Sequence, residues 1–109
     1  AIERHGNRLL MRIFSEQEIQ DAGGRVESLA ARFAAKEAVS KALGTGIGEV
    51  TWHEIIILRG ESREPILKLC GRAEDLARVL GIELWAISLS HTQDLAIALV
   101  VASGSTANI

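Results

Sequence analysis

ARFAAKEAVSKALGTGIG, residues 31–48, is the stretch that decides the fold of this chain. Its first part lies in a predicted helix over residues 26–43, which is rich in alanine and contains no proline and no glycine before Gly44. Alanines cover one side of this helix. The other side carries the bulky apolar residues Val26, Leu29, Phe33 and Leu43. Because the helix is apolar nearly all round, it is predicted to be buried.

The second half of this helix carries charges at Lys36, Glu37 and Lys41. Glu37 and Lys41 are four residues apart and therefore share one edge of the helix. They could form an ion pair on a narrow exposed strip. They could also bind something ionic, because a buried charge is costly unless it is paired. Since little of the helix is expected to be exposed, the second interpretation is favoured.

A glycine-rich loop, Gly-Thr-Gly-Ile-Gly at residues 44–48, follows the helix. Gly44 stands where a helix C-terminal cap is expected. Without Cβ atoms, the amides of such a loop can approach a phosphate or another backbone. The spacing fits neither a Walker loop nor a dinucleotide-binding fingerprint. Taken alone, the loop favours a simple helix-to-strand turn.

Together these residues carry a family resemblance. FAAKEAxSKALGTGIG resembles the signature of the holo-acyl-carrier-protein synthases, the small 4'-phosphopantetheinyl transferases. WAISLSHT, residues 85–92, is a second match. The resemblance implies an α+β fold, in which a curved antiparallel sheet packs on a long buried helix. It also implies a homotrimer with active sites between neighbours.

The resemblance implies one reaction, used in fatty acid biosynthesis. The 4'-phosphopantetheine of coenzyme A is transferred to a serine of apo acyl carrier protein, which releases 3',5'-ADP. In the family Mg²⁺ bridges the pyrophosphate, and Glu37 matches a metal ligand while Lys41 neutralises phosphate charge. These two are the expected catalytic residues. The residues implied to bind coenzyme A are Lys41, Gly44, Pro65, His91 and Thr92.

Basic residues are spaced by four in the N-terminal segment, at Arg4, Arg8 and Arg12. On a helix they line one edge, which is either an ordinary solvated face or a basic ridge for an acidic partner. The resemblance favours the ridge, because acyl carrier proteins are acidic and meet this region in the family. Ser15 and Glu18 then form a capping-box pattern, which predicts a short helix ending near Ala22.

The remaining elements are predicted from periodicity and turn residues. A strand over 51–58 pairs with one over 66–70, a helix spans 71–80 with Leu80 among its inward residues, and strands over 84–90 and 95–102 are joined at 91–94. Trp85 should lie on the opposite face from Leu84. The family has a Gly-basic-Pro turn between the first two strands. Pro65 matches it, but Arg63 stands at the glycine position.

Composition limits the remaining possibilities. With 109 residues the chain forms one domain, and its 48% apolar content suggests surface covered by other subunits. A net charge of −2 does not indicate nucleic-acid binding. The single cysteine, Cys70, excludes an intrachain disulfide and favours the cytoplasm. No run is apolar enough for a membrane helix, so no membrane partner is expected.

One departure concerns the start. The family begins with a strand of the type GIGxDxxxI, whose Asp is the other protein ligand of the metal, and residues 1–109 begin after that point. We therefore expect a single transferase domain that lacks its first strand, leaves a sheet edge unpaired and has weak or no activity as a 109-residue chain.

The alternative is a non-catalytic module that binds coenzyme A or a nucleotide, or that only oligomerises. Periodicity alone supports this as well as it supports an enzyme. Clustering of Glu37, Lys41, Gly44 and His91 around one cleft would favour the enzyme.

Overall fold

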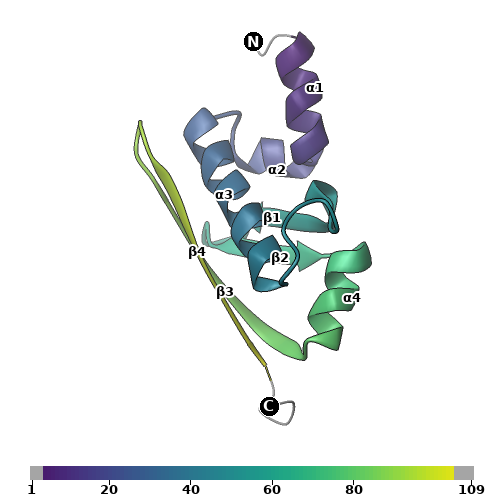
Figure 1. Cartoon of the computed structure of the whole chain (residues 1–109). Coiled ribbons are helices and arrows are strands. Elements are labelled where there is room, and N and C mark those ends of the chain that lie inside the picture. The colour runs from purple at the N-terminus through teal and green to yellow at the C-terminus, as the bar shows by residue number, and fades with distance from the viewer. Residues whose placement is uncertain (1–3, 105–109) are drawn as a thin grey trace.

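The computed structural model describes residues 4–104, and the side chains of residues 8–104. Three helices come first, followed by a short 3₁₀ helix, a hairpin, a fourth helix and a second hairpin (Figure 1). The elements are α1 (Arg4–Ile13), α2 (Glu16–Asp21), α3 (Val26–Ala42), η1 (Trp52–Glu54), β1 (Ile55–Arg59), β2 (Pro65–Leu69), α4 (Gly71–Val79), β3 (Ile82–His91) and β4 (Ala96–Gly104). None of the described helices is long and apolar enough to cross a membrane.

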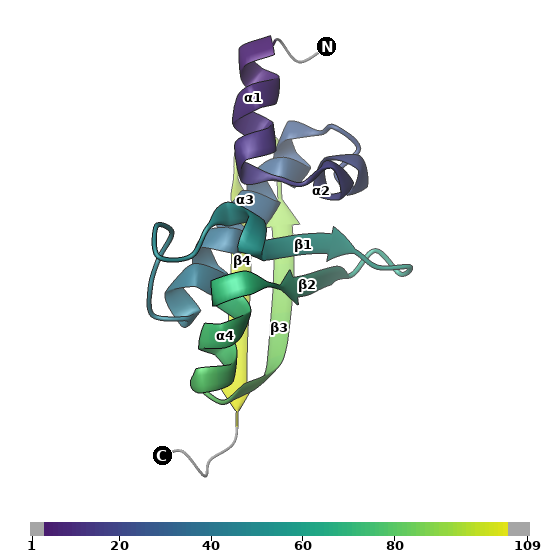
Figure 2. The same ribbon diagram turned by 90° about the vertical axis from the view of Figure 1, so that its right-hand side faces the viewer.

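Helix α3 lies at the centre of the molecule, against the long β3–β4 hairpin (Figure 1). The β1–β2 hairpin runs across the direction of β3 and β4, with α4 beside it (Figure 2). The buried apolar core joins these elements and consists of Ala35, Val39, Leu43, Val50, Ile55, Ile57, Ala73 and Ala77. The expected α+β class, with a long helix packed on antiparallel strands, is confirmed.

The strands form two separate two-stranded sheets rather than one curved sheet. Ile57 pairs with Leu67 in the first hairpin, and Ile87 pairs with Val100 in the second. The edge of β1 that faces away from β2 is bonded to side chains of α2 instead of to a strand. The Ile57 amide donates to Glu18 (2.8 Å). Farther along, the Arg59 amide donates to Asp21 (2.8 Å). Side chains thus satisfy edge groups that a neighbouring strand would otherwise pair.

The buried side of α3 differs from the expected one. Val26 is 74% exposed and Phe33 is 39% exposed, although both were predicted to face the core. The buried stripe instead includes the polar residues Ser28, Arg32, Lys36 and Ser40. Hydrogen bonds within the fold offset the loss of hydration of these buried polar groups. Small residues such as Ala35 let the neighbouring elements approach closely.

Two smaller predictions were wrong. Residues 51–54 form a capped 3₁₀ turn rather than the start of a strand, because Glu54 accepts the Thr51 amide (2.7 Å). Leu80, which was predicted to point inward, is the C-cap of α4 and is 49% exposed. By contrast, the capping box of Ser15 and Glu18 is confirmed, with the two reciprocal bonds at 2.9 and 3.2 Å.

The β3–β4 hairpin has one face toward α3 and one face open. Trp85 packs against the core while Leu84 is 70% exposed, as the alternation predicted. The open face, which we call the outer apolar face, carries the exposed residues Leu84, Ile97, Leu99 and Val101. Within the described chain, nothing covers it.

Candidate functional site

A pocket of about 220 Å³ lies between the N-terminal half of α3 and the ends of β1 and β3. We call it the arginine pocket, because four of its lining residues are arginines. Its charged and titratable lining consists of Arg25, Arg32, Arg59, Arg63, Asp21 and His91. Ser28 and Pro65 also line it. Positive charge therefore exceeds negative charge, which favours an anionic ligand.

Arg32 is the best-ordered cation of this pocket. Its side chain is 5% exposed, and Nε donates to the Ile57 carbonyl (3.2 Å). Nη1 donates to the Ser28 hydroxyl (2.5 Å) and the Ser28 carbonyl (3.3 Å). Burial lowers the pKa of Arg32 from its ordinary value, while the carboxylates of Asp21 and Glu18 act in the opposite direction. Because the pKa of an arginine starts far above neutral pH, the guanidinium stays charged.

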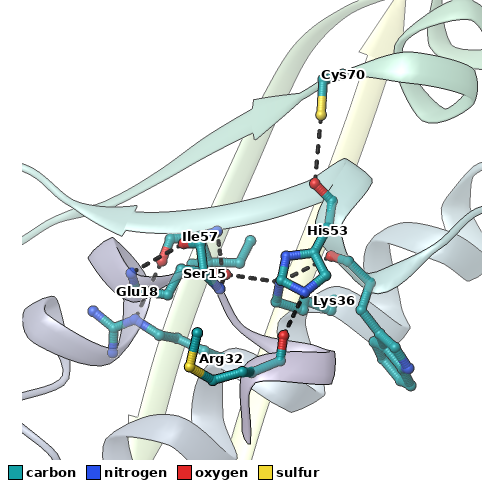
Figure 3. A network of polar contacts seen from close by, with 9 residues as sticks. Ser15, Glu18, Arg32, Lys36, His53, Ile57 and Cys70 are labelled. Atoms are coloured by element: carbon teal, nitrogen blue, oxygen red, sulfur yellow. Dashed lines mark hydrogen bonds and ion pairs between the residues drawn. The ribbon is translucent and has the colours of Figure 1, made fainter. Parts of the chain in front are cut away.

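A fully buried ion pair lies beside Arg32, between α2 and α3 (Figure 3). Lys36 Nζ is 2.9 Å from Glu18 Oε1 and also donates to the Trp52 carbonyl (2.9 Å). The second carboxylate oxygen of Glu18 accepts the Ile57 amide. Burial lowers the pKa of Lys36, and the charge of Glu18 opposes that shift. Both charges are thus fully compensated, which a buried pair requires.

Asp21 does not block the arginine pocket for anions, because its oxygens are already engaged. Oδ2 accepts the Arg59 amide (2.8 Å) and Oδ1 accepts the Gln17 amide nitrogen (2.7 Å). Burial raises the pKa of Asp21, but the bond from the Arg59 backbone and the neighbouring cations outweigh it, so the pKa is lowered overall. Asp21 therefore remains ionised at neutral pH and holds α2 against β1.

In the turn before Pro65, a residue other than glycine adopts a backbone conformation that usually requires glycine. Arg63 has φ of +66°, in the left-handed region that favours glycine. Its amide donates to the Gly60 carbonyl (3.0 Å), while the Gly60 amide donates to the Glu64 carbonyl (2.7 Å). Arg63, at the glycine position of the Gly-basic-Pro pattern, thus places a cation in the pocket lined by Pro65, while Glu64 stands at the basic position.

His91 ends β3 and is an exposed lining residue of the arginine pocket, as a ligand role would require. Thr92 follows it in the hairpin turn. Its hydroxyl oxygen accepts the amides of Asp94 (3.3 Å) and Leu95 (3.1 Å). The hydroxyl proton can still be donated, so Thr92 combines a turn-forming role with one free donor.

Glu37, Lys41 and Gly44 lie elsewhere. Glu37 is half-buried and Lys41 and Gly44 are exposed, and none of them lines the arginine pocket. Lys41 lies thirteen residues after Ser28 on α3, or about 20 Å at 1.5 Å per residue. A single chain therefore does not bring the predicted site residues into one cleft.

The metal prediction rests on Glu37 alone within this chain. Among the residues described, no group of three or more His, Cys, Asp or Glu side chains could hold a metal ion. Mg²⁺ prefers six oxygen ligands and is usually held by one or two carboxylates with waters and phosphates. A magnesium ion at Glu37 would therefore need water, phosphate or further oxygen ligands besides this one carboxylate.

Helix α1 carries the predicted basic ridge. Arg8 and Arg12 are exposed on it, whereas Arg4 begins the helix but its side chain lies outside those described. His53 Nε2 lies 2.7 Å from the Met11 carbonyl and joins the end of α1 to η1 (Figure 3). The 3₁₀ helix η1 thus contacts both α1, through His53, and the buried ion pair, through the Trp52 carbonyl.

Sequence reasoning missed most of the arginine pocket. Arg25 and Arg32 are seven residues apart, so they share a helix face, and this spacing was the available signal. Arg59 and Arg63 flank the turn in which only Pro65 was singled out. Isolated surface arginines are common, and only the fold shows that these four converge.

Comparisons with known proteins agree with this fold and these motifs. Residues 1–100 match the model of the 4'-phosphopantetheinyl transferase superfamily, and the chain belongs to that family. A holo-[acyl-carrier-protein] synthase of Herpetosiphon aurantiacus is 44% identical over 95% of this chain and 87% of its own length. One of Desulforudis audaxviator is 45% identical over 95% of this chain and 82% of its own length.

Solved structures of such synthases share the fold. The Helicobacter pylori holo-[acyl-carrier-protein] synthase in complex with coenzyme A superposes with a TM-score of 0.82 at 34% identity, covering 94% of this chain and 87% of that one. The Bacillus anthracis synthase in complex with CoA (3',5'-ADP) gives a TM-score of 0.72 at 35% identity, covering 95% and 87%.

Proposed function

We propose that this chain transfers 4'-phosphopantetheine from coenzyme A to a serine of an acyl carrier protein, and that the arginine pocket binds the nucleotide end of coenzyme A. Family membership makes the chain a transferase. The observation that carries the proposal is the convergence of four arginines with His91 and Pro65 in one pocket.

The charge of the pocket suits this ligand. Coenzyme A carries a 3'-phosphate and a pyrophosphate, and arginine forks bind phosphate oxygens through charge-assisted hydrogen bonds. The solved relatives from Helicobacter pylori and Bacillus anthracis were obtained with coenzyme A and with CoA (3',5'-ADP). His91 and Thr92 add hydrogen-bonding side chains at the hairpin tip.

The transfer itself asks for little chemistry from the chain. Phosphoryl transfer to a hydroxyl depends mainly on positioning and on neutralising charge. The attacking serine belongs to the carrier protein, so the chain needs no nucleophile of its own. In the proposal Lys41 neutralises phosphate charge, and Glu37 is one ligand of a Mg²⁺ ion whose other ligands come from outside the described side chains.

A homotrimer would unite the two halves of the site. In one chain neither Glu37 nor Lys41 lines the arginine pocket that includes His91, so neighbouring copies would bring these residues together. The outer apolar face supports this, because exposed Leu84, Ile97 and Leu99 would be unusual on a monomer of this size. Sedimentation equilibrium should give the mass of three chains; a monomer at micromolar concentration would contradict the proposed assembly.

The acidic carrier protein would dock on α1. Exposed Arg8 and Arg12 supply the complementary charge there. A cytoplasmic setting completes the proposal, since Cys70 is a free thiol within the described chain.

Transfer can be tested by the mass of the carrier protein. The chain, coenzyme A, Mg²⁺ and apo carrier protein should yield a carrier heavier by one phosphopantetheine. Glu37→Ala should slow the reaction at least ~100-fold if the carboxylate serves the metal. Glu27→Ala, on the first turn of the same helix, is the matched control and should keep the rate.

Two outcomes would oppose the proposal. Binding of 3',5'-ADP with no transfer, even at high enzyme concentration, would favour the non-catalytic module. Equal losses in Glu37→Ala and Glu27→Ala would remove the special role of Glu37.

A further inference from the structure

The guanidinium of Arg32 is held in one orientation by groups from two elements. Nε donates to the Ile57 carbonyl of β1, and Nη1 donates to both the hydroxyl and the carbonyl of Ser28 on α3. Ser28 is 7% exposed, so water does not compete strongly for these bonds. The guanidinium is planar, and fixing two of its nitrogens fixes the direction of the third.

The backbone of Ile57 is itself held in place by a second hydrogen bond. The amide of the same residue donates to Glu18 Oε2 (2.8 Å), so both polar backbone groups of Ile57 are bonded to side chains (Figure 3). Glu18 is in turn fixed by Lys36 and by the Ser15 amide, each at 2.9 Å. A continuous buried chain of bonds therefore runs from Lys36 through Glu18 and Ile57 to Arg32.

The third nitrogen, Nη2, remains available. Among residues 8–104 no hydrogen bond to Nη2 is found, and no fully buried side-chain nitrogen or oxygen there lacks a partner. Nη2 is therefore not fully buried, and Arg32 meets open space in the arginine pocket. Its two N–H groups can bind an anion without any rearrangement of the side chain.

We propose that Ser28 is a positioning residue, which together with the Ile57 carbonyl aims Arg32 Nη2 at the phosphate of the nucleotide in the arginine pocket. This inference rests on the proposed function. Neither the Ser28 hydroxyl nor the buried pair of Glu18 and Lys36 needs to touch the ligand. They act by removing the rotamer freedom that Arg32 would otherwise lose on binding.

The test is a double-mutant cycle that measures the dissociation constant of 3',5'-ADP by calorimetry. Arg32→Ala should weaken binding ~10- to 100-fold, as expected for the loss of charged hydrogen bonds. Ser28→Ala should weaken binding about 5-fold, because Arg32 keeps its charge but becomes less ordered. In the Arg32→Ala background, Ser28→Ala should have no further effect.

Thr51→Ala is the control, because it also removes a hydroxyl that is bonded within the fold, to Glu54 Oε1 (3.1 Å), and Thr51 does not line the arginine pocket. It should leave the dissociation constant unchanged. Melting temperatures of all variants are measured alongside. Ser28→Ala retains the Ser28 carbonyl as a partner of Arg32, so it should fold with only a small loss of stability.

The outcomes separate this inference from the proposed function. If Arg32→Ala leaves 3',5'-ADP binding intact, the nucleotide does not use the pocket and the proposed function loses its main support. If Arg32→Ala weakens binding but Ser28→Ala does not, or does so equally in both backgrounds, Ser28 does not act through Arg32 and the inference is overturned.

Discussion

At the scale of single residues, the buried pair of Lys36 and Glu18 is the most consequential feature. Both side chains are fully buried, and bonds to them come from the start of α2, from β1 and from η1. Lys36 Nζ also lies 5.4 Å from the centre of the Phe14 ring. Removing one partner leaves an uncompensated charge in the core, whereas removing both charges does not.

Lys36→Met should therefore lower the free energy of unfolding by about 3 kcal/mol or more. The double variant Glu18→Gln/Lys36→Met should recover most of that loss, because no buried charge remains. Urea unfolding followed by circular dichroism measures both. Lys68→Met, on an exposed position of β2, is the control and should stay within about 0.5 kcal/mol of wild type. A Lys36→Met loss below about 1 kcal/mol would show that the pair contributes little.

At Arg63, the backbone conformation and the proposed ligand favour different residues. Its left-handed backbone suits glycine, yet its side chain lines the arginine pocket. Arg63→Gly should leave stability unchanged or raise it by up to about 1 kcal/mol, because the strain relieved is partly offset by glycine entropy. The same change should weaken 3',5'-ADP binding several-fold through the lost charge. Thermal melts measure the change in stability, and calorimetry measures the change in 3',5'-ADP affinity. Tighter binding by the glycine variant would refute the assigned role.

At the scale of elements, Glu54 serves the two helices on either side of the first hairpin. One carboxylate oxygen accepts the Thr51 amide and closes η1. The other accepts the Arg72 amide in the first turn of α4. The Thr51 amide is the largest cause of a lowered Glu54 pKa, which burial only partly opposes. One side chain thus caps elements that lie far apart in sequence.

This capping gives stability a defined pH dependence. The Glu54 pKa is lowered from its ordinary 4.5 on folding, so its contribution is fully present above pH 4.5 and is lost as pH falls through the folded pKa. Glu54→Gln should cost about 1 kcal/mol at pH 7, and the difference from wild type should shrink below pH 4. Unfolding free energies between pH 3 and 7 measure this. A difference that is constant with pH would exclude a role for the carboxylate charge.

At the scale of the whole molecule, the division of the site is decisive. The residues of α3 that line the arginine pocket end at Arg32, and Lys41 lies nine residues farther along the same helix, about 14 Å at 1.5 Å per residue. A helix is too rigid to fold these two regions together. In the proposed homotrimer, the other half of each site would come from a neighbouring copy.

Mixing two inactive variants tests this. Glu37→Ala and His91→Ala should each be nearly inactive. Subunits unfolded together at equal amounts and refolded should regain about a quarter of the wild-type rate, since one neighbour pair in four joins an intact Glu37 to an intact His91. Each variant refolded alone is the control. No gain on mixing would mean that both residues act within one chain or that no shared site exists.

Local patterns in the sequence predicted the elements well. The alanine-rich helix, the capping box of Ser15 and Glu18, the two hairpins and the alternation along β3 depend on neighbours within a few residues. Boundaries moved by a few residues where a local cap replaced strand pairing, as the Glu54 carboxylate did at residues 51–54. Of the predicted ligand residues, His91 and Pro65 meet in one pocket, whereas Glu37, Lys41 and Gly44 lie apart from it.

The sequence by itself determined the helices, the hairpins and the family motifs, because short-range hydrogen bonds and side-chain periodicity are written in adjacent residues. The tertiary structure alone decided which polar residues of α3 are buried, that Arg32 reaches a carbonyl twenty-five residues away, and that four scattered arginines line one pocket. These depend on how α2, α3 and β1 pack. A pattern on one helix shows which residues share a face, but not what that face will meet.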